Sequence, residues 1–200
     1  MRLKDKTAII TGGGSGIGLA TARAFCKEGA KVILFGRRKE KLISAADELG
    51  ESVLIVQGDM THNDDLDQLI NKTLNNFKGI DILVNSAGLF NGAPLHEISD
   101  SQWDGMMDIN IRSIFQLTRR VLPIMMAQKS GSIVHISSIL GLIAVPQVAA
   151  YNVSKGALNQ FSRSIAVEYG SYGIRSNSIC PGLIETDMTA DLMKDASLMQ

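Results

Sequence analysis

Cysteine is scarce in this sequence, and the two that occur argue against a disulfide framework. Cys26 and Cys180 stand far apart and form no CxxC pair, so neither a bridged scaffold nor a thiolate metal knuckle is predicted. The three histidines, His62, His96 and His135, show no ligand spacing among themselves, whereas protein metal sites need several ligands that converge. We therefore expect no metal.

Net charge and long apolar runs are also lacking. Twenty Lys and Arg residues balance twenty Asp and Glu residues, so the chain lacks the basic surface on which binding to nucleic acid or an anionic membrane depends. No apolar run approaches the length of about eighteen residues that a membrane span needs, and residues 1–11 lack the apolar core of a signal peptide. We expect a cytoplasmic protein with no nucleic-acid partner and no membrane partner.

What the sequence does have is a regular alternation of short β-rich runs with helical patterns. The runs are 7–11, 31–35, 53–57, 81–85, 132–137 and 174–180, and the helical segments are roughly 16–28, 39–49, 64–77, 101–128 and 154–170. This alternation predicts a doubly wound, three-layered α/β fold with a parallel sheet. Without a linker or repeat, residues 1–200 are expected to form a single domain. Its ligand site should lie outside the carboxyl ends of the strands.

A glycine-rich turn, "TGGGSGIGLATA" at 11–22, follows the first predicted strand. Gly12, Gly16 and Gly18 permit a tight turn and a close backbone approach, and the next helix offers free N–H groups to a pyrophosphate. A merely flexible turn is the alternative, because the GxGxxG spacing is absent. The position between the first strand and a helix favours nucleotide binding.

The spacing TGxxxGxG resembles the cofactor loop of the short-chain dehydrogenase/reductase family, which has a Rossmann-like fold. "NSAG" at 85–88 is similar to the family's NNAG, with Ser86 at the second position, and "GDM" at 58–60 and "PGLIETDM" at 181–188 match two further segments. By this resemblance Asp59 bonds the adenine amino group, although such an Asp is also a common turn residue. Ile184 and Thr186 hold the nicotinamide carboxamide. The cofactor-binding residues that the resemblance implies are Gly12, Ser15, Gly16, Ile17, Gly18, Arg37, Arg38, Asp59, Met60, Asn85, Ala87, Gly88, Tyr151, Lys155, Pro181, Gly182, Ile184 and Thr186.

The end of the second predicted strand, "LFGRRKEKL", bears on which nicotinamide cofactor binds. Rossmann units for NAD usually place an acid there to bond the ribose 2′-OH. Gly36 stands at that position, followed by Arg37 and Arg38, whose guanidinium groups suit a 2′-phosphate. The alternative is that both arginines only precede a solvated helix. NADP(H) is favoured, and NAD(H) is possible.

Four residues resemble the catalytic tetrad of the same family in order and spacing. Tyr151 and Lys155 lie four residues apart, so on a helix their side chains share a face. Ser138 lies thirteen residues before Tyr151, and Asn110 lies on the preceding long helix. Ser137 is the rival of Ser138, but a shift of one residue on a strand turns a side chain to the opposite face.

Carbonyl reduction and alcohol oxidation both require a group that exchanges a proton with the substrate oxygen. Reduction needs a proton donor beside the oxygen, and oxidation needs the same group as a base. A tyrosine of pKa about 10 is a poor base, but a nearby ammonium lowers a pKa by about 1–3 units. By resemblance, Lys155 also bonds the nicotinamide ribose and Ser138 holds the substrate oxygen. Asn110 holds a water or, alternatively, bonds local backbone.

The residues that the resemblance places near the substrate are mostly apolar, and they favour a ketone, oxoacyl or sugar-like carbonyl compound or a secondary alcohol over a phosphate or small carboxylate. They are Leu89, Phe90, Ile139, Leu140, Val145, Gln147, Met188, Leu192 and Met193. The family commonly pairs its subunits through the segments 101–128 and 154–170, which implies a homodimer or homotetramer.

The end of the chain departs from the family pattern. Members usually continue with another helix and a strand, whereas this sequence stops at Gln200, so we expect a C-terminally shortened member. Besides an oxidoreductase, this leaves open a nucleotide-binding protein that is non-catalytic or impaired. An epimerase or dehydratase uses the same Tyr and Lys, but usually needs a larger C-terminal substrate domain.

Overall fold

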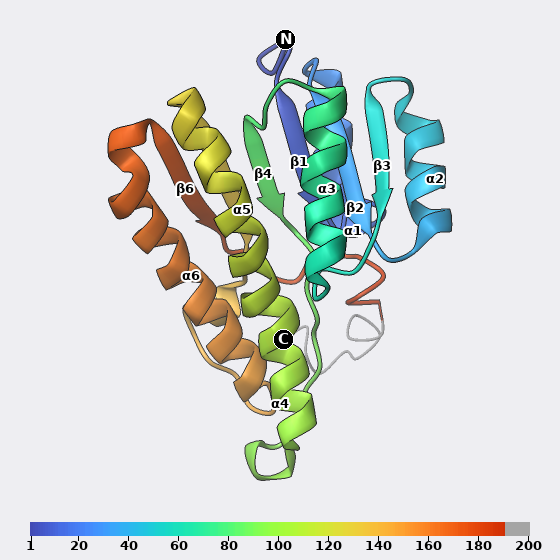
Figure 1. Ribbon diagram of the computed structural model, residues 1–200. Coiled ribbons are helices and arrows are strands. Elements are labelled where there is room, and N and C mark those ends of the chain that lie inside the picture. Colours follow the sequence, from blue (N-terminus) through green and yellow to red (C-terminus); the bar gives the residue numbers. More distant parts are fainter. Residues whose placement is uncertain (191–200) are drawn as a thin grey trace.

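A computed structural model of the chain describes residues 1–190 and contains one six-stranded parallel sheet with helices on both faces (Figure 1). The strand order is β3-β2-β1-β4-β5-β6, which confirms the doubly wound α/β prediction. The strands are β1 Thr7–Thr11, β2 Lys31–Gly36, β3 Val53–Gln57, β4 Ile82–Asn85, β5 Gly131–Ile136 and β6 Ile174–Ile179. The α-helices are α1 Gly16–Lys27, α2 Lys39–Leu49, α3 Asn63–Asn76, α4 Asp100–Met107, α5 Ser113–Gln128 and α6 Ala149–Tyr169.

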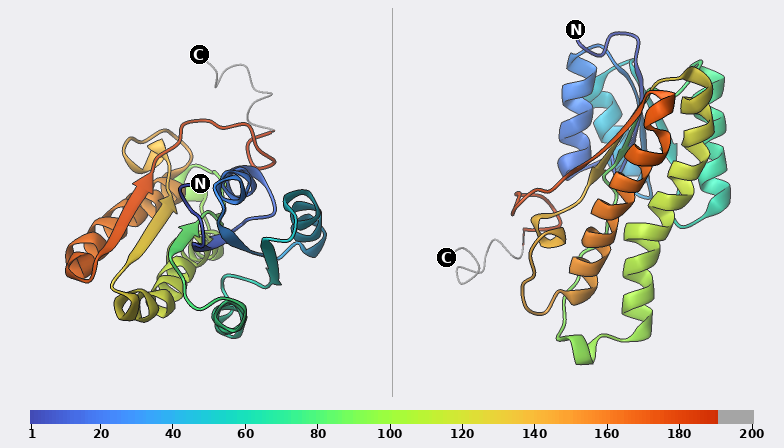
Figure 2. Two further views of the ribbon diagram at one scale, coloured as in Figure 1. Left: turned by 90° about the horizontal axis from the view of Figure 1, so that it is seen from above. Right: turned by 90° about the vertical axis from the view of Figure 1, so that its left-hand side faces the viewer.

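Two apolar clusters, one on each face of the sheet, form the core. Alternation along β1 sends Ile9 to one face and Ala8 and Ile10 to the other, as the two-residue period of a strand requires. The cluster around Ile9 is covered by α3, α5 and α6, and the opposite cluster is covered by α1 and α2. Figure 2 shows the resulting three layers, with α1 and α2 together on one side of the sheet.

Two helical predictions are corrected by the structure. The expected helix 101–128 is two α-helices, α4 and α5, joined by a π-helical turn at Asp108–Arg112. The expected helix 154–170 begins earlier, at Ala149, so Tyr151 lies on its first turn. α4 and α6 both reach beyond the carboxyl ends of the strands, where they flank the space outside the sheet (Figure 1).

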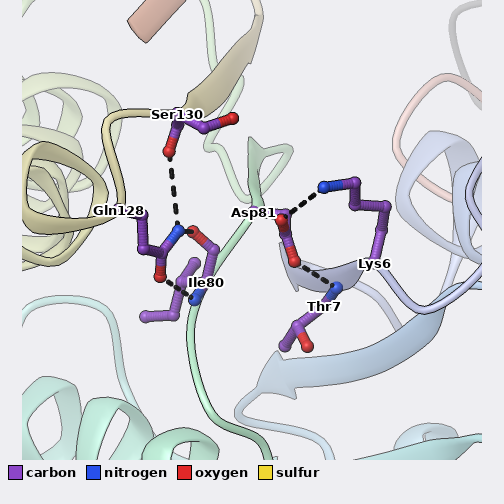
Figure 3. Close-up of polar contacts among 6 residues, drawn as sticks. All are labelled: Lys6, Thr7, Ile80, Asp81, Gln128 and Ser130. Carbon is purple, nitrogen blue, oxygen red and sulfur yellow. Dashed lines mark hydrogen bonds and ion pairs between the residues drawn. The ribbon is translucent and has the colours of Figure 1, made fainter. Parts of the chain in front are cut away.

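An aspartate just before β4 joins the amino-terminal ends of two neighbouring strands (Figure 3). One carboxylate oxygen of Asp81 accepts a 2.8 Å bond from the Lys6 ammonium, and the other accepts a 2.9 Å bond from the backbone N–H of Thr7. These contacts tie the start of β1 to the start of β4. They satisfy an N–H that would otherwise be left over where the ladder begins.

A glutamine from the end of α5 completes this end of the sheet (Figure 3). The amide of Gln128 accepts a bond from the Ile80 N–H and donates one to the Ile80 carbonyl, each at 3.0 Å. The amide nitrogen also donates a 3.5 Å bond to the Ser130 carbonyl. Gly79 leaves room for this contact, because a Cβ there would meet the Gln128 side chain.

Within residues 1–190, no helix is both long and apolar enough to cross a bilayer.

Candidate active site

A cleft of about 600 Å³ lies at the carboxyl ends of the strands. Segments that follow all six strands line it, which is the place that an open parallel sheet offers to a ligand. Most of the residues expected to bind a cofactor are among its lining residues. Those are Gly12, Ser15, Gly16, Ile17, Arg37, Arg38, Asp59, Met60, Ala87, Gly88, Tyr151, Lys155, Pro181, Gly182, Ile184 and Thr186.

The glycine loop fits a dinucleotide backbone. Gly12 and Gly16 adopt φ values of +65° and +50°, a conformation that disfavours side chains. A Cβ on Gly12 would come within 3.1 Å of the Ala87 backbone, and a Cβ on Gly18 would collide with the Gly12 carbonyl. Gly18 therefore lies beneath the cleft and permits helix α1 to pack closely. Ser15 makes no side-chain cap to α1, so the N-terminal N–H groups of the helix have no side-chain acceptor there.

Cations gather at one end of the cleft, beyond β2. Arg37 lies 3.8 Å from Asp59, and the Arg38 guanidinium donates a 2.8 Å bond to the Ser15 hydroxyl. Lys41, from the first turn of α2, lines the same end. Lys41 was not predicted from the sequence, although it follows the N-cap residue Arg38 by three positions and so lies on the same side of the helix start.

Asp59 is held as a turn residue whose carboxylate stays ionised. One of its oxygens accepts bonds from the Thr61 N–H at 2.9 Å and the Thr61 hydroxyl at 2.8 Å. Partial burial works against ionisation, but the Thr61 hydrogen bonds and the charges of Arg37 and His62 hold the pKa of Asp59 below its usual value. Asp59 therefore both stabilises a turn and lines the cleft.

At the opposite end, Tyr151 extends from the first turn of α6 into the cleft. Its ring meets the ring of Phe90 edge-on, with centroids 4.9 Å apart. Burial raises the pKa of Tyr151 above 10, and a hydrogen bond with Ser138 opposes this rise. The pKa of Tyr151 is therefore raised rather than lowered, because burial is the larger effect; that Lys155 lowers it during the reaction stays a prediction.

Lys155 lies one turn further along α6 and is only 4% exposed. Its ammonium donates a 2.8 Å bond to the Ile136 carbonyl and lies 5.5 Å from the centroid of the Tyr151 ring. Burial lowers the pKa of Lys155 to about 8, opposed by the neighbouring Cys180. The ammonium is therefore charged at neutral pH, but it loses its proton more readily than an exposed lysine does.

The two serines after β5 point in different directions. Ser137 donates a 3.1 Å bond to the Lys155 carbonyl, which fixes β5 against α6. Ser138 accepts a 3.1 Å bond from the Leu140 N–H and is the serine whose hydroxyl affects the pKa of Tyr151. The geometry thus separates the two candidates: Ser138 faces the phenol and Ser137 faces the helix backbone.

Asn110 lies in the π-helical turn and is fully buried. Its amide oxygen accepts a 2.8 Å bond from the Leu89 N–H, and its nitrogen donates a 2.9 Å bond to the Leu89 carbonyl. The nitrogen also lies 3.1 Å from the Ser154 hydroxyl. The backbone bond foreseen as the alternative role exists, but to a distant segment: Asn110 ties the chain after β4 to α6. Single π turns occur often at functional sites.

Asn85, expected at the cofactor, lies beneath the cleft instead. It is fully buried, and its amide nitrogen lies 3.2 Å from Nδ1 of His135. Burial, with a smaller effect of the Lys155 charge, lowers the pKa of His135 to about 4. The imidazole is therefore neutral at physiological pH and accepts the bond from Asn85.

The expected apolar substrate residues divide into three groups. Leu89, Phe90 and Met188 line the cleft, whereas Ile139, Leu140, Val145 and Gln147 are not among its lining residues. Leu192 and Met193 lie outside the described residues. Among residues 1–190, no three His, Cys, Asp or Glu side chains come together as a metal site would require.

Comparisons with known proteins agree with this fold and site. The short chain dehydrogenase family matches residues 6–197. An uncharacterized oxidoreductase of Staphylococcus aureus is 38% identical over 189 residues, which are 94% of this chain and 82% of that protein. A 2-(R)-hydroxypropyl-CoM dehydrogenase of Xanthobacter autotrophicus is 40% identical over 192 residues, which are 92% of this chain and 77% of that protein.

Two solved structures are similar over nearly the whole chain. A short chain dehydrogenase/reductase family protein superposes with a TM-score of 0.92 at 34% identity, over 98% of this chain and 82% of the other. The crystal structure of gox2181 superposes with a TM-score of 0.96 at 35% identity, over 99% of this chain and 79% of the other. The family resemblance inferred from the motifs is confirmed.

Proposed function

The chain belongs to the short-chain dehydrogenase/reductase family, and from that premise we propose that it transfers a hydride between NADP(H) and the carbonyl or secondary alcohol carbon of a small molecule. Family membership makes it an oxidoreductase with a nicotinamide cofactor. The observation that carries the proposal is the shared cleft, in which the glycine loop and the Ser138–Tyr151–Lys155 group meet. Binding and proton transfer would then happen side by side.

Tyr151 is the proposed general acid and base. When bound, the nicotinamide ring would donate or accept the hydride. The Tyr151 phenol would give its proton to the carbonyl oxygen during reduction and take it back during oxidation. Its raised pKa keeps the phenol protonated near neutral pH, which is the form that reduction needs. Oxidation therefore needs a nearby positive charge that lowers the pKa of the phenol.

Lys155 and Ser138 would assist this proton transfer. The Lys155 ammonium is charged at neutral pH and lies on the same helix face as the phenol, so it stabilises the phenolate; we assign it the ribose hydroxyls as well. Ser138 lines the cleft with Tyr151 and lowers the pKa of its phenol, so its hydroxyl would hold the substrate oxygen beside the proton donor and stabilise the developing charge.

Asn110 is proposed as a positioning residue rather than a ligand of a catalytic water. Its oxygen accepts from the Leu89 N–H, and its nitrogen donates to the Leu89 carbonyl. The bonds hold the chain beside Gly88, where a Cβ would come within 3.4 Å of the Asn110 oxygen and 3.7 Å of the Lys155 nitrogen. Asn110 therefore shapes the floor on which the nicotinamide ribose would rest.

The proposed preference for NADP(H) rests on the cations after β2. Arg37 and Arg38 line the cleft where a ribose 2′-group would lie, and Gly36 supplies no carboxylate for a 2′-OH. A 2′-phosphate would interact with both guanidinium groups through charge-assisted bonds. NAD(H), which has no 2′-phosphate, would bind without these bonds but with the same contacts elsewhere.

The proposed substrate is a small ketone, oxoacyl compound or secondary alcohol. Leu89, Phe90 and Met188 supply apolar lining, and the Phe90 ring contacts Tyr151. Beside Tyr151, Lys155 is the single cation among the described lining residues. A relative that is a 2-(R)-hydroxypropyl-CoM dehydrogenase is in line with alcohol oxidation. We also propose a homodimer or homotetramer formed through α4, α5 and α6, on which Phe115 and Val167 are 43% and 87% exposed.

A panel assay separates this enzyme from a nucleotide-binding protein without turnover. Purified full-length protein is mixed with ketones, oxoacyl compounds and secondary alcohols, each with NADP(H) and with NAD(H), and nicotinamide absorbance is followed. We expect at least one compound to be turned over, and faster with NADP(H). Dinucleotide binding without any hydride transfer across the panel would favour the non-catalytic alternative.

A further inference from the structure

A carboxylate from the far side of the cleft occupies the cation cluster after β2. One oxygen of Asp187 lies 3.7 Å from the Arg38 guanidinium and 3.7 Å from the Lys41 ammonium. Arg38 also donates a 2.8 Å bond to Ser15. An anion thus already lies between two cations that line the expected 2′-phosphate position.

The segment that presents Asp187 is a defined turn after β6. The Thr186 N–H donates a 3.0 Å bond to the Thr189 hydroxyl, and the Thr189 N–H donates a 3.1 Å bond to the Thr186 carbonyl. A Cβ on Gly16 would meet the Thr186 methyl group at 3.2 Å. The turn therefore rests on the glycine loop, with Asp187 at its tip and directed to α2.

The ion pairs of Asp187 are weak enough for a ligand to replace. The side chains of Arg38, Lys41 and Asp187 are 58%, 53% and 61% exposed. At 3.7 Å the charges attract one another without a hydrogen bond of normal length. Exposed pairs of this kind change an equilibrium by a factor of about five at most. A phosphate carries more charge and three acceptor oxygens, so it competes well for the same cations.

We propose that Asp187 and Lys41 are specificity-determining residues for the cofactor, and that Asp187 holds the place of the 2′-phosphate. The inference rests on the proposed binding of a nicotinamide dinucleotide in this cleft. A 2′-phosphate displaces the Asp187 carboxylate from Arg38 and gains Lys41 as a third cation. The tip of the turn at 186–189 is then released from α2, whereas a ribose 2′-OH leaves it in place.

The test compares dinucleotide affinities of the wild type and Asp187→Asn. Dissociation constants of NADP⁺, NAD⁺, 2′,5′-ADP and 5′-ADP are measured by calorimetry on full-length protein. Removing the competing carboxylate is expected to tighten NADP⁺ and 2′,5′-ADP by about two- to five-fold, with NAD⁺ and 5′-ADP unchanged. Glu185→Gln, a neighbouring exposed acid, is the matched control and should change none of the four.

The variant Lys41→Gln tests the same inference in the same affinity measurements. This variant should weaken 2′,5′-ADP about two- to five-fold and leave 5′-ADP unchanged. The gain from Asp187→Asn should be smaller in the double variant, because the two residues share one contact. An Asp187→Asn protein with an unchanged ratio of 2′,5′-ADP to 5′-ADP affinity would overturn the inference. So would weaker NAD⁺ binding, since that would make Asp187 a ligand of the 2′-OH.

The same data separate this inference from the proposed function. The wild-type ratio of 2′,5′-ADP to 5′-ADP affinity tests the NADP(H) preference, whereas the change of that ratio in Asp187→Asn tests the competition. A wild type without preference whose Asp187→Asn variant gains one supports the inference and defeats the preference. A wild type with preference whose variant does not change defeats the inference alone.

Discussion

Polar side chains are arranged differently at the amino-terminal and the carboxyl-terminal ends of the strands. At the amino-terminal ends, Asp81 and Gln128 each make two or more hydrogen bonds that join β1, β4 and α5. At the carboxyl-terminal ends of the strands, Lys155 is buried with one hydrogen bond to a carbonyl, and burial raises the pKa of Tyr151. One end of the sheet satisfies its polar groups, and the other keeps them available to a ligand.

This difference indicates where the molecule gains stability and where it loses it. A satisfied hydrogen-bond network stabilises the fold, whereas a buried charge with few partners destabilises it. Active sites commonly bear such a cost, so replacement of a functional residue often raises stability while it removes activity. Substitutions at the two ends should therefore change the free energy of unfolding in opposite directions.

The largest expected effect on stability is at Lys155. Its pKa is lowered from 10.5 to about 8, and at about 1.4 kcal/mol per tenfold change in proton affinity the buried charge costs up to roughly 3 kcal/mol at neutral pH. Lys155→Met should raise the free energy of unfolding by roughly 1–3 kcal/mol in urea denaturation and abolish turnover. Lys129→Met, on the αL residue that ends α5, controls for the general effect of losing a lysine.

The sign of the pH dependence sharpens this prediction. Below about pH 8 the lysine is protonated in both the folded and the unfolded chain, so the cost is fully present. Between about pH 8 and 10.5 the folded chain loses the proton first, and wild-type stability rises relative to the variant. The advantage of Lys155→Met should thus shrink with rising pH. A variant that is less stable than the wild type at pH 7 would contradict the comparison.

A smaller effect of opposite sign is expected at Asp81. Asp81→Ala removes the acceptor of the Thr7 N–H and the partner of Lys6, and should lower the free energy of unfolding by roughly 1–2 kcal/mol. Dinucleotide affinity should not change, since Asp81 lies at the other end of the sheet. Asp47→Ala, an exposed acid on α2, should stay within about 0.5 kcal/mol. Weakened dinucleotide binding in Asp81→Ala would show that the two ends are not independent.

Much of the fold could be predicted because its signals are local. The runs 31–35 and 53–57 each contain four consecutive apolar residues, and the glycine loop between a strand and a helix identified the end of the sheet at which a ligand binds. The π turn at Asp108–Arg112 could not be foreseen. Its five residues continue directly from α4 into α5, so no break in the sequence marks it.

The site was predicted where motifs are contiguous and missed where the chain converges only on folding. Ser138, Tyr151 and Lys155 were predicted because their order and spacing resemble the catalytic tetrad of the family. Asp187 meets Lys41 from a segment more than a hundred residues away, and no sequence pattern relates the two. The raised pKa of Tyr151 was missed for a similar reason, since burial depends on neighbours such as Phe90 that only the folded chain supplies.

The most direct test of the central claim is the rate of hydride transfer in Tyr151→Phe. With the panel compound that the wild type converts fastest, single-turnover rates and dinucleotide dissociation constants are measured for both proteins, and Tyr172→Phe, on the turn after α6, is the matched control. The rate in Tyr151→Phe should fall by roughly 10²–10⁴-fold while dinucleotide affinity stays the same and the control behaves as wild type. A Tyr151→Phe protein that transfers hydride at the wild-type rate would contradict the assignment of Tyr151 as the proton donor.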